Sequence, residues 1–147
     1  MLASGGPDKS ILIWDSKKNS PGTRITAHKD KVYCARFNET SKLLGTCGEQ
    51  GEIFIWDIAK PNQPLAKIQK QPLVLYDLKW SGNEEYFFVS SLGSELYAFS
   101  SKNFALISSD AVTSNAHDSK CETVASNFKL INNRVFCGTS RGVIAWY

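Results

Sequence analysis

The first candidates for chemistry are the residues around His28, because histidine is the side chain most often used as a general base. Asp30 and Cys34 follow it closely, so a base, an acid and a nucleophile stand in one short segment. A catalytic triad needs these three types within hydrogen-bond reach of one another. The segment reads as a loop that enters a β-strand, whose successive side chains point to opposite faces. We therefore predict that His28 is structural and that the chain is not an enzyme.

Two other patterns are of the kind that serves phosphate binding or acid–base chemistry. Glycines cluster at Gly5–Gly6 and at Gly48–Gly51, but a phosphate-binding loop leads into a helix, and both stretches read as turns between strands. The carboxylates Glu84 and Glu85 are adjacent in a turn, so their side chains diverge. Neither pattern indicates an active site, and no cofactor is predicted.

The cysteines and histidines do not have the spacing of a metal site. Zinc ligands usually come in closely spaced pairs such as C-x-x-C, which this chain lacks, so no metal is predicted. An even number of cysteines leaves an oxidising compartment open. We interpret them as free, partly buried thiols of an intracellular protein: Cys34, Cys47, Cys121 and Cys137.

The elements that carry these residues are short strands. Apolar residues alternate or run briefly between clusters of Gly, Pro, Asn, Asp and Ser, which is typical of strands and turns. The pair Trp14-Asp15 recurs as Trp56-Asp57, 42 residues later. Four segments that end in an aromatic residue are versions of one another: Ser10–Trp14, Glu52–Trp56, Glu95–Phe99 and Gly142–Trp146.

Each of these segments has companions at equivalent places. The strand before it is predicted at Leu2–Gly5, Leu43–Cys47, Tyr86–Ser91 and Arg134–Gly138. A still earlier strand is predicted at Val32–Phe37, Val74–Trp80 and Cys121–Phe128, and a joining strand at Thr23–Thr26, Leu65–Ile68 and Phe104–Ile107. A period of about 42 residues with four strands in each unit predicts the blades of an all-β propeller.

The Trp-Asp pairs, this period and Ala27-His28 before a strand resemble the WD-repeat family over the whole chain. The resemblance implies an incomplete WD-repeat β-propeller of about 3.5 four-stranded blades; a seven-bladed ring is one whole that it could belong to, and the total number of blades stays open. The chain is then one domain, residues 1–147, with approximate units 1–27, 28–69, 70–108 and 109–147.

In that family a His, a Ser or Thr, a turn Asp and a Trp form a hydrogen-bonded set in each blade. The matching positions here are Ser4, Asp8, Trp14, His28, Thr46, Trp56, His117 and Trp146. In the second unit Gln50 occupies the place of the turn Asp, so we expect a weaker network there. In the third unit Phe99 stands for the Trp and no His is present.

The strand count predicts open ends. The units hold three, four, four and three strands, and a blade buries its faces only against its neighbours. Exposed blade faces and strand edges favour association. We therefore expect this chain to be a fragment of a longer propeller or to be completed by a second chain.

Composition narrows the function classes. With 42% hydrophobic and 12% aromatic residues the chain is a folded domain, and it has neither an apolar run that spans a bilayer nor a signal peptide. The net charge is +3, and no run of Lys or Arg exceeds two residues. We therefore predict a non-catalytic scaffold for other proteins, with no membrane partner. The candidate contacts are Lys17, Lys18, Lys29, Lys31, Lys60, Lys102, Lys120 and Arg141.

Parts of the chain resemble particular members of the family. Leu78–Trp80, Tyr86–Ser90 and Asn115–His117 are similar to the WD-repeat subunit of the THO complex, which implies nuclear mRNA processing and export. Leu2–Lys9 and Cys137–Tyr147 are similar to propellers of nuclear-pore export and of the spindle checkpoint. Both imply protein partners and favour the nucleus over the cytoplasm.

A different class of function is direct binding of RNA or DNA. It requires a clustered basic face with aromatic side chains available for stacking. The strand positions of the tyrosines predict that they are packed rather than presented: Tyr33, Tyr76, Tyr86 and Tyr97. Nucleic acid therefore stays the alternative partner.

Overall fold

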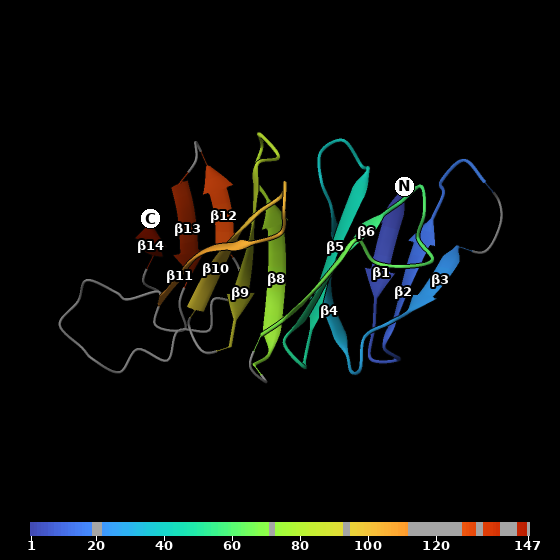
Figure 1. Cartoon of the computed structure of the whole chain (residues 1–147), viewed down its shortest axis with the longest axis horizontal. Coiled ribbons are helices and arrows are strands. Elements are labelled where there is room, and N and C mark those ends of the chain that lie inside the picture. Colours follow the sequence, from blue (N-terminus) through green and yellow to red (C-terminus); the bar gives the residue numbers. More distant parts are fainter. Residues whose placement is uncertain are drawn as a thin grey trace.

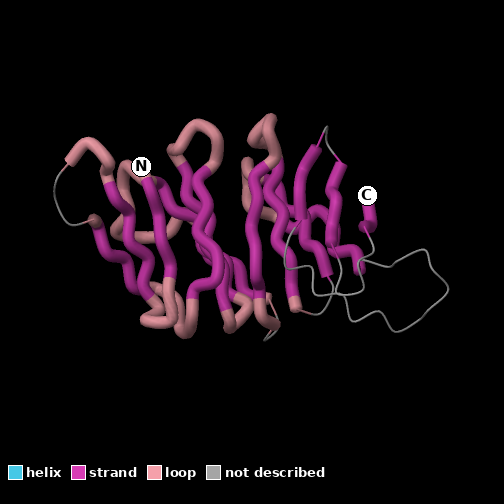
Figure 2. The backbone as a smooth tube through the Cα atoms, turned by 180° about the vertical axis from the view of Figure 1, so that it is seen from behind, coloured by secondary structure: helices cyan, strands magenta, loops and turns pink. Residues whose placement is uncertain are grey.

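The computed structural model describes residues 1–18, 22–70, 73–92, 95–111, 128–131, 134–138 and 144–146, with side chains up to residue 109. Within these residues the chain forms fourteen β-strands and no helix (Figures 1 and 2). The all-β fold predicted from the sequence is confirmed, as a series of antiparallel sheets.

The strands form four sheets in chain order, with three, four, four and three strands. Sheet 1 contains β1 (Leu2–Gly5), β2 (Ser10–Trp14) and β3 (Thr23–Thr26). Sheet 2 contains β4 (Val32–Phe37), β5 (Leu43–Gly48), β6 (Glu52–Asp57) and β7 (Ala66–Gln69). Sheet 3 contains β8 (Leu75–Trp80), β9 (Tyr86–Ser91), β10 (Glu95–Ser100) and β11 (Leu106–Ala111). Sheet 4 contains β12 (Phe128–Ile131), β13 (Arg134–Gly138) and β14 (Ile144–Trp146).

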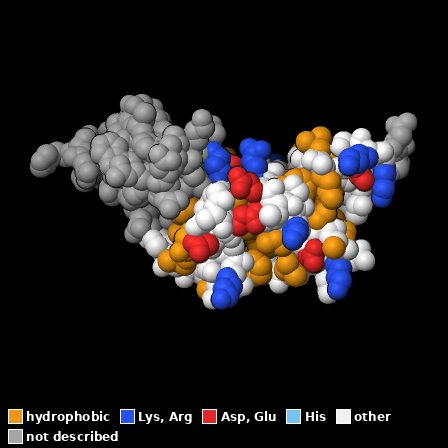
Figure 3. Space-filling view, turned by 90° about the horizontal axis from the view of Figure 1, so that it is seen from above, with side chains coloured by type: hydrophobic (Ala, Val, Ile, Leu, Met, Phe, Trp, Pro, Cys, Tyr) orange, Lys and Arg blue, Asp and Glu red, His pale blue; other side chains and the backbone are white. Residues whose placement is uncertain are grey.

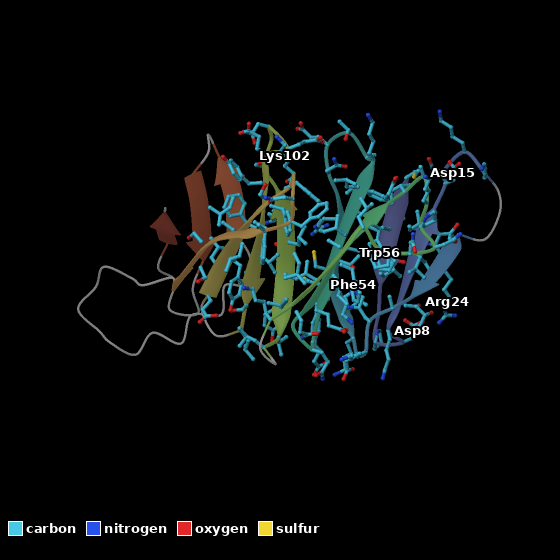
Figure 4. All side chains as sticks on the ribbon, viewed as in Figure 1. Asp8, Asp15, Arg24, Phe54, Trp56 and Lys102 are labelled. Atoms are coloured by element: carbon cyan, nitrogen blue, oxygen red, sulfur yellow. The ribbon has the colours of Figure 1, made fainter. Side chains whose placement is uncertain are left out.

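The sheets follow one another along the long axis of the molecule, with the strands roughly upright in the view of Figure 1. The first strands β1, β4 and β8 lie beside one another. Because the strands are antiparallel, successive loops alternate between two rims. We call them the Lys102 rim, at the top of Figure 4, and the Asp8 rim, at the bottom. Each is made of loops from several sheets.

Sheet 2 is buried on both faces because its strands alternate. One face presents Leu44, Phe54 and Trp56 to a cluster that includes Ile11 and Ile13 of sheet 1. The opposite face packs against sheet 3. The core cluster between these two sheets contains Cys34, Cys47, Ile53, Ile55, Leu75, Leu78, Phe87, Val89, Tyr97 and Phe99. The approach is close at Gly45, where an added Cβ would lie 2.8 Å from the side chain of Leu78.

One strand prediction differs from the structure by more than two residues at one end, and one is tested only at its last residue. The joining strand of the third unit was expected at Phe104–Ile107, but β11 begins at Leu106, because Phe104 lies in a turn with a φ of 59°. Its side chain packs against the core between sheets 2 and 3. The strand expected at Cys121–Phe128 lies outside the described residues except for Phe128, which begins β12.

The prediction that the tyrosines are packed is wrong for two of them. Tyr97 is buried, but Tyr86 is exposed and Tyr33 is 43% exposed. The register of β4 shifts between Val32 and Cys34, and that of β8 between Leu75 and Asp77, so a tyrosine sits at each irregularity. Such bulges re-aim a side chain. Here the rings of Tyr33 and Tyr76 lie 5.4 Å apart.

Candidate functional site

The best-defined polar site centres on Thr46 of β5, in the core between sheets 1 and 2. His28 comes from the loop before β4, and Trp56 lies near the end of β6. The Trp56 Nε1–H donates to Thr46 Oγ1 over 3.1 Å, and His28 Nε2 lies 2.9 Å from the same oxygen. All three side chains are buried. The structure thus brings together the three family positions that were expected in the second unit, His28, Thr46 and Trp56.

The chemistry of the groups gives this network a direction. The indole N–H is a donor only, so it uses one acceptor position of the Thr46 hydroxyl. The hydroxyl proton is then available to His28 Nε2, which accepts it when the ring is neutral with its proton on Nδ1. That Nδ1 lies 3.9 Å from the Glu52 carboxylate, which favours this tautomer. The network runs from indole through hydroxyl to imidazole.

The acid beside His28 is Glu52, which the sequence analysis did not single out. Gln50, at the position of the family's turn Asp, instead donates from Nε2 to Asp30 over 3.3 Å. Glu52 is buried at the start of β6, and its Oε2 accepts the backbone N–H of Lys29 at 2.8 Å. The signal in the sequence was an acid at the start of an otherwise apolar strand. The hydrogen bond between Glu52 and the Lys29 backbone ties the loop that carries His28 to sheet 2.

Burial controls the protonation of His28. Loss of solvation lowers its pKa from 6.5 to about 4, against the opposing effect of the Glu52 carboxylate, and Lys67 adds a smaller lowering. The ring is therefore neutral near pH 7. It also packs edge-on against Phe54, with ring centroids 4.7 Å apart. A neutral, packed imidazole is a structural group.

The other oxygen of Glu52 is poorly satisfied. Its Oε1 is buried without a well-formed hydrogen bond, although Lys67 Nζ lies 3.3 Å away. The same ammonium lies 5.2 Å from the centroid of the Phe54 ring. Lys67 is therefore the cation that balances Glu52 on the solvent side, since a buried carboxylate without a partner is strongly unfavourable.

Sheet 3 has different side chains at the positions that form the polar network in sheet 2. Phe99 replaces the Trp, as expected, and Tyr97 occupies the register position of Phe54. The Lys70 ammonium lies over both rings, 4.7 Å from the centroid of Tyr97 and 5.5 Å from that of Phe99. The Tyr97 hydroxyl donates to Glu95, and burial together with this contact raises its pKa. A lysine above two aromatic rings lies here in place of a histidine network.

In sheet 1 the three family positions are placed differently. Ser4 and Trp14 are exposed. Asp8 accepts a hydrogen bond of 2.7 Å from the Ser10 hydroxyl and forms an ion pair of 2.6 Å with Arg24. The Ser10 hydrogen bonds, followed by Arg24, lower the pKa of Asp8. Figure 4 shows Asp8 and Arg24 together near the bottom of the view.

The remaining family positions are in the last unit. His117 lies outside the described residues, and Trp146 belongs to β14, where only the backbone is described. Their membership of a polar network stays a prediction.

The candidate contact lysines divide between the two rims. The loops that carry Lys17, Lys18, Lys60 and Lys102 belong to the Lys102 rim, and the loop that carries Lys29 and Lys31 belongs to the Asp8 rim. Lys31 pairs with Glu49 over 3.0 Å, which raises its pKa. Lys120 and Arg141 lie outside the described residues. Figure 3 shows acids and bases interspersed on the rim seen from above.

The described side chains include no group of three or more His, Cys, Asp or Glu with a geometry for a metal ion. Cys34 and Cys47 are buried free thiols. Across the part of the chain that is described, no helix is long and apolar enough to cross a bilayer. The geometry of the His28 site supports packing, and the two rims carry exposed polar groups such as Lys17, Lys29 and Lys60.

Part of the chain matches a known family of repeats. Residues 19–57 match the family model described as "WD domain, G-beta repeat". The WD repeat-containing protein WDS homolog of Arabidopsis thaliana is 32% identical over 65 residues, which cover 44% of this chain and 12% of the relative. Methylosome protein WDR77 of Xenopus laevis is 35% identical over 66 residues, which cover 44% and 20%.

A third relative aligns with nearly the whole chain. The U5 small nuclear ribonucleoprotein 40 kDa protein of Dictyostelium discoideum is 25% identical over 150 aligned positions, which cover 97% of this chain and 42% of the relative. The chain thus spans less than half of each of these three relatives. Residues 19–57 thus match one WD repeat, and the antiparallel sheets of the described residues are consistent with blades of an incomplete WD β-propeller.

Proposed function

We propose that this chain is a non-catalytic scaffold that joins other proteins into a multiprotein assembly. The observation that carries the proposal is the placement of the polar groups. His28 and Glu52 are used in contacts inside the sheets, whereas the loops of both rims carry exposed lysines. WD-repeat proteins generally mediate interactions between proteins. A rigid stack of sheets with variable loops suits that role.

For the kind of assembly, we propose nuclear RNA processing. The name of one relative supports it, a small nuclear ribonucleoprotein protein. Export of mRNA by a THO-like complex, indicated by the resemblance of Leu78–Trp80 and Tyr86–Ser90, is the specific form we propose within that class. The proposed location is accordingly the nucleus.

The test is capture of partners by the tagged chain from nuclear extract, followed by mass spectrometry. Charge reversal of one rim at a time identifies the contacting face. One variant changes Lys17, Lys60 and Lys102 to Glu, and the matched variant changes Lys29 and Lys31 to Glu. We expect one variant to lose a stable set of proteins that the other retains. If the tagged chain recovers only nucleic acid, which nuclease treatment then removes, the result contradicts the scaffold and favours direct binding of RNA or DNA.

We propose in addition that a second polypeptide covers the outer face of sheet 1. Leu2 and Trp14 are register partners there, as Leu44 and Trp56 are in sheet 2. Leu2 is 64% and Trp14 39% exposed, whereas Leu44 is 0% and Trp56 1% exposed, because sheet 1 covers them. The free face therefore repeats the residue types of a face that binds a neighbouring sheet. Light scattering of the purified chain tests this, since association predicts a mass above 16.3 kDa.

A further inference from the structure

One edge of sheet 1 is formed by β1, which has no strand on its outer side among the described residues. The register identifies its counterparts. Leu2 of β1 lies opposite Trp14. Leu44 of β5 lies opposite Trp56 in the same way, and β9 has this place in sheet 3. On their other side β5 and β9 each pair with a further antiparallel strand, β4 and β8. On the same side β1 presents backbone N–H and C=O groups that are a template for a strand.

The two strands at this place in sheets 2 and 3 share one sequence pattern. β4 reads Val-Tyr-Cys-Ala-Arg-Phe, and β8 reads Leu-Tyr-Asp-Leu-Lys-Trp. In both, the register is irregular at the tyrosine. The first residues, Val32 and Leu75, are buried, whereas the basic side chain of Arg36 at the fifth position is 60% exposed. The positions that face protein are therefore the first, second, third, fourth and sixth.

β4 forms a second wall beside this edge. The Val32 backbone N–H donates to the Gly6 carbonyl over 3.1 Å, just beyond the end of β1. β1 contacts β4 as β5 contacts β8, so sheets 1 and 2 stack in the same manner as sheets 2 and 3. A strand paired with β1 would thus stand to β4 as β4 stands to β8.

Tyr33 shows what such a strand would contact. Its ring lies 5.4 Å from that of Tyr76, the tyrosine at the same position of β8. Tyr33 is nevertheless 43% exposed, because β8 covers it from one side only. The repeat places the tyrosine of an added strand on the exposed side of Tyr33, where it continues the row of rings.

We propose that the free edge of β1 binds an extended segment of a partner protein as a fourth, antiparallel strand of sheet 1. The segment has an apolar residue, a tyrosine, a small or polar residue, an apolar residue, a solvent-facing residue and an aromatic residue, in that order. The aromatic residue lies opposite Leu2, as Phe37 lies opposite Leu44 and Trp80 opposite Phe87. Directly opposite residues share a face, so it would cover Leu2, which is 64% exposed. The proposal rests on the scaffold function proposed above and names one of its contact sites.

The probe is the acetylated and amidated peptide Lys-Val-Tyr-Ser-Ala-Arg-Phe-Asn, which has the sequence of residues 31–38 with serine in place of the cysteine. A scrambled peptide of the same composition is its control. Tyr33→Ala removes the ring that the peptide should contact. The matched variant is Tyr86→Ala, because Tyr86 is 41% exposed but lies in sheet 3.

The experiment is an NMR titration of the ¹⁵N-labelled full chain, with amide hydrogen exchange measured at saturating peptide. We expect alternate amides of β1 to exchange at least about tenfold more slowly, since successive residues of a strand point their N–H groups to opposite neighbours. Tyr33→Ala should weaken binding about fivefold, the effect of one aromatic pair. Tyr86→Ala should bind as the parent chain does, with equal thermal melting in both variants.

Three results would each overturn the proposal: equal binding of the scrambled peptide, unchanged exchange of the β1 amides at saturation, or equal affinity of the two tyrosine variants. The scaffold function is decided separately by partner capture. If the chain captures proteins that an excess of the peptide does not displace, the scaffold stands and the β1 edge is not its contact site.

Discussion

At the scale of single residues, Thr46 holds the centre of the polar network. Its hydroxyl is the common partner of the Trp56 indole and the His28 imidazole. Both groups are buried, so neither has water as a substitute partner. An unmade hydrogen bond in such a place costs about 1–3 kcal/mol for each group.

We predict that Thr46→Val destabilises the chain by about 2–3 kcal/mol, because valine has the same shape but leaves the indole and the imidazole unpaired. Urea unfolding measures the change. Thr46→Ser is the control, since it keeps the oxygen and loses only a methyl group, at about 1 kcal/mol. Equal losses for the two variants would show that packing rather than hydrogen bonding explains the effect.

The depressed pKa of His28 predicts a dependence of stability on pH. The unfolded chain takes up a proton near pH 6.5, whereas the folded chain resists it until about pH 4. The contribution is fully present above pH 6.5 and is lost as the pH falls to about 4. It amounts to about 3 kcal/mol from this one residue.

Urea unfolding of the parent chain and of His28→Gln across that pH range isolates the effect. The difference in the free energy of unfolding between the two should shrink as the pH falls. Parallel curves would contradict the prediction, because the other titrating groups are common to both proteins.

At the scale of the elements, close contacts of backbone fix how sheet 2 meets its neighbouring loop. Gly48 ends β5, and an added Cβ there would lie 2.1 Å from the Lys31 carbonyl oxygen. That carbonyl also accepts the Glu49 backbone N–H at 3.0 Å. The loop before β4, which carries His28, therefore depends on a residue without a side chain at this position.

We predict that Gly48→Ala destabilises the chain by about 2 kcal/mol or more, through overpacking against a backbone that cannot move freely. Gly82→Ala is the matched control and should change stability by less than about 0.5 kcal/mol, because its position is open. Thermal unfolding of both variants gives the comparison. A similar melting temperature for the two would contradict the close contact.

At the scale of the whole molecule, the outer face of sheet 1 is an apolar surface left uncovered among the described side chains. It presents Leu2 and Trp14 in the register that sheet 2 uses to bind sheet 1. An exposed apolar sheet face favours association.

We predict that the double variant Leu2→Lys, Trp14→Lys lowers the mass measured by light scattering, with little change in the unfolding midpoint. The control is Tyr86→Lys, an exposed aromatic on sheet 3. We expect the control to associate like the parent chain. If the double variant keeps the parent's mass, this face is not the site of association.

The sequence by itself determined the class of fold. Short segments with alternating apolar residues predict strands, and the 42-residue spacing of Trp14 and Trp56 predicts that these strands form a repeated unit. The resemblance to the WD-repeat family also pointed to His28, Thr46 and Trp56, which the structure joins. Those are local patterns, and each can be recognised along one strand or one repeat.

Only the tertiary structure decided which acid faces His28, which tyrosines are exposed, and which lysine replaces the missing histidine. Glu52, Tyr33 and Lys70 owe their roles to the reach of a side chain across strands, to a bulge, and to the approach of two sheets. These depend on the three-dimensional register and on packing between elements. Residue type and spacing along one strand do not encode them.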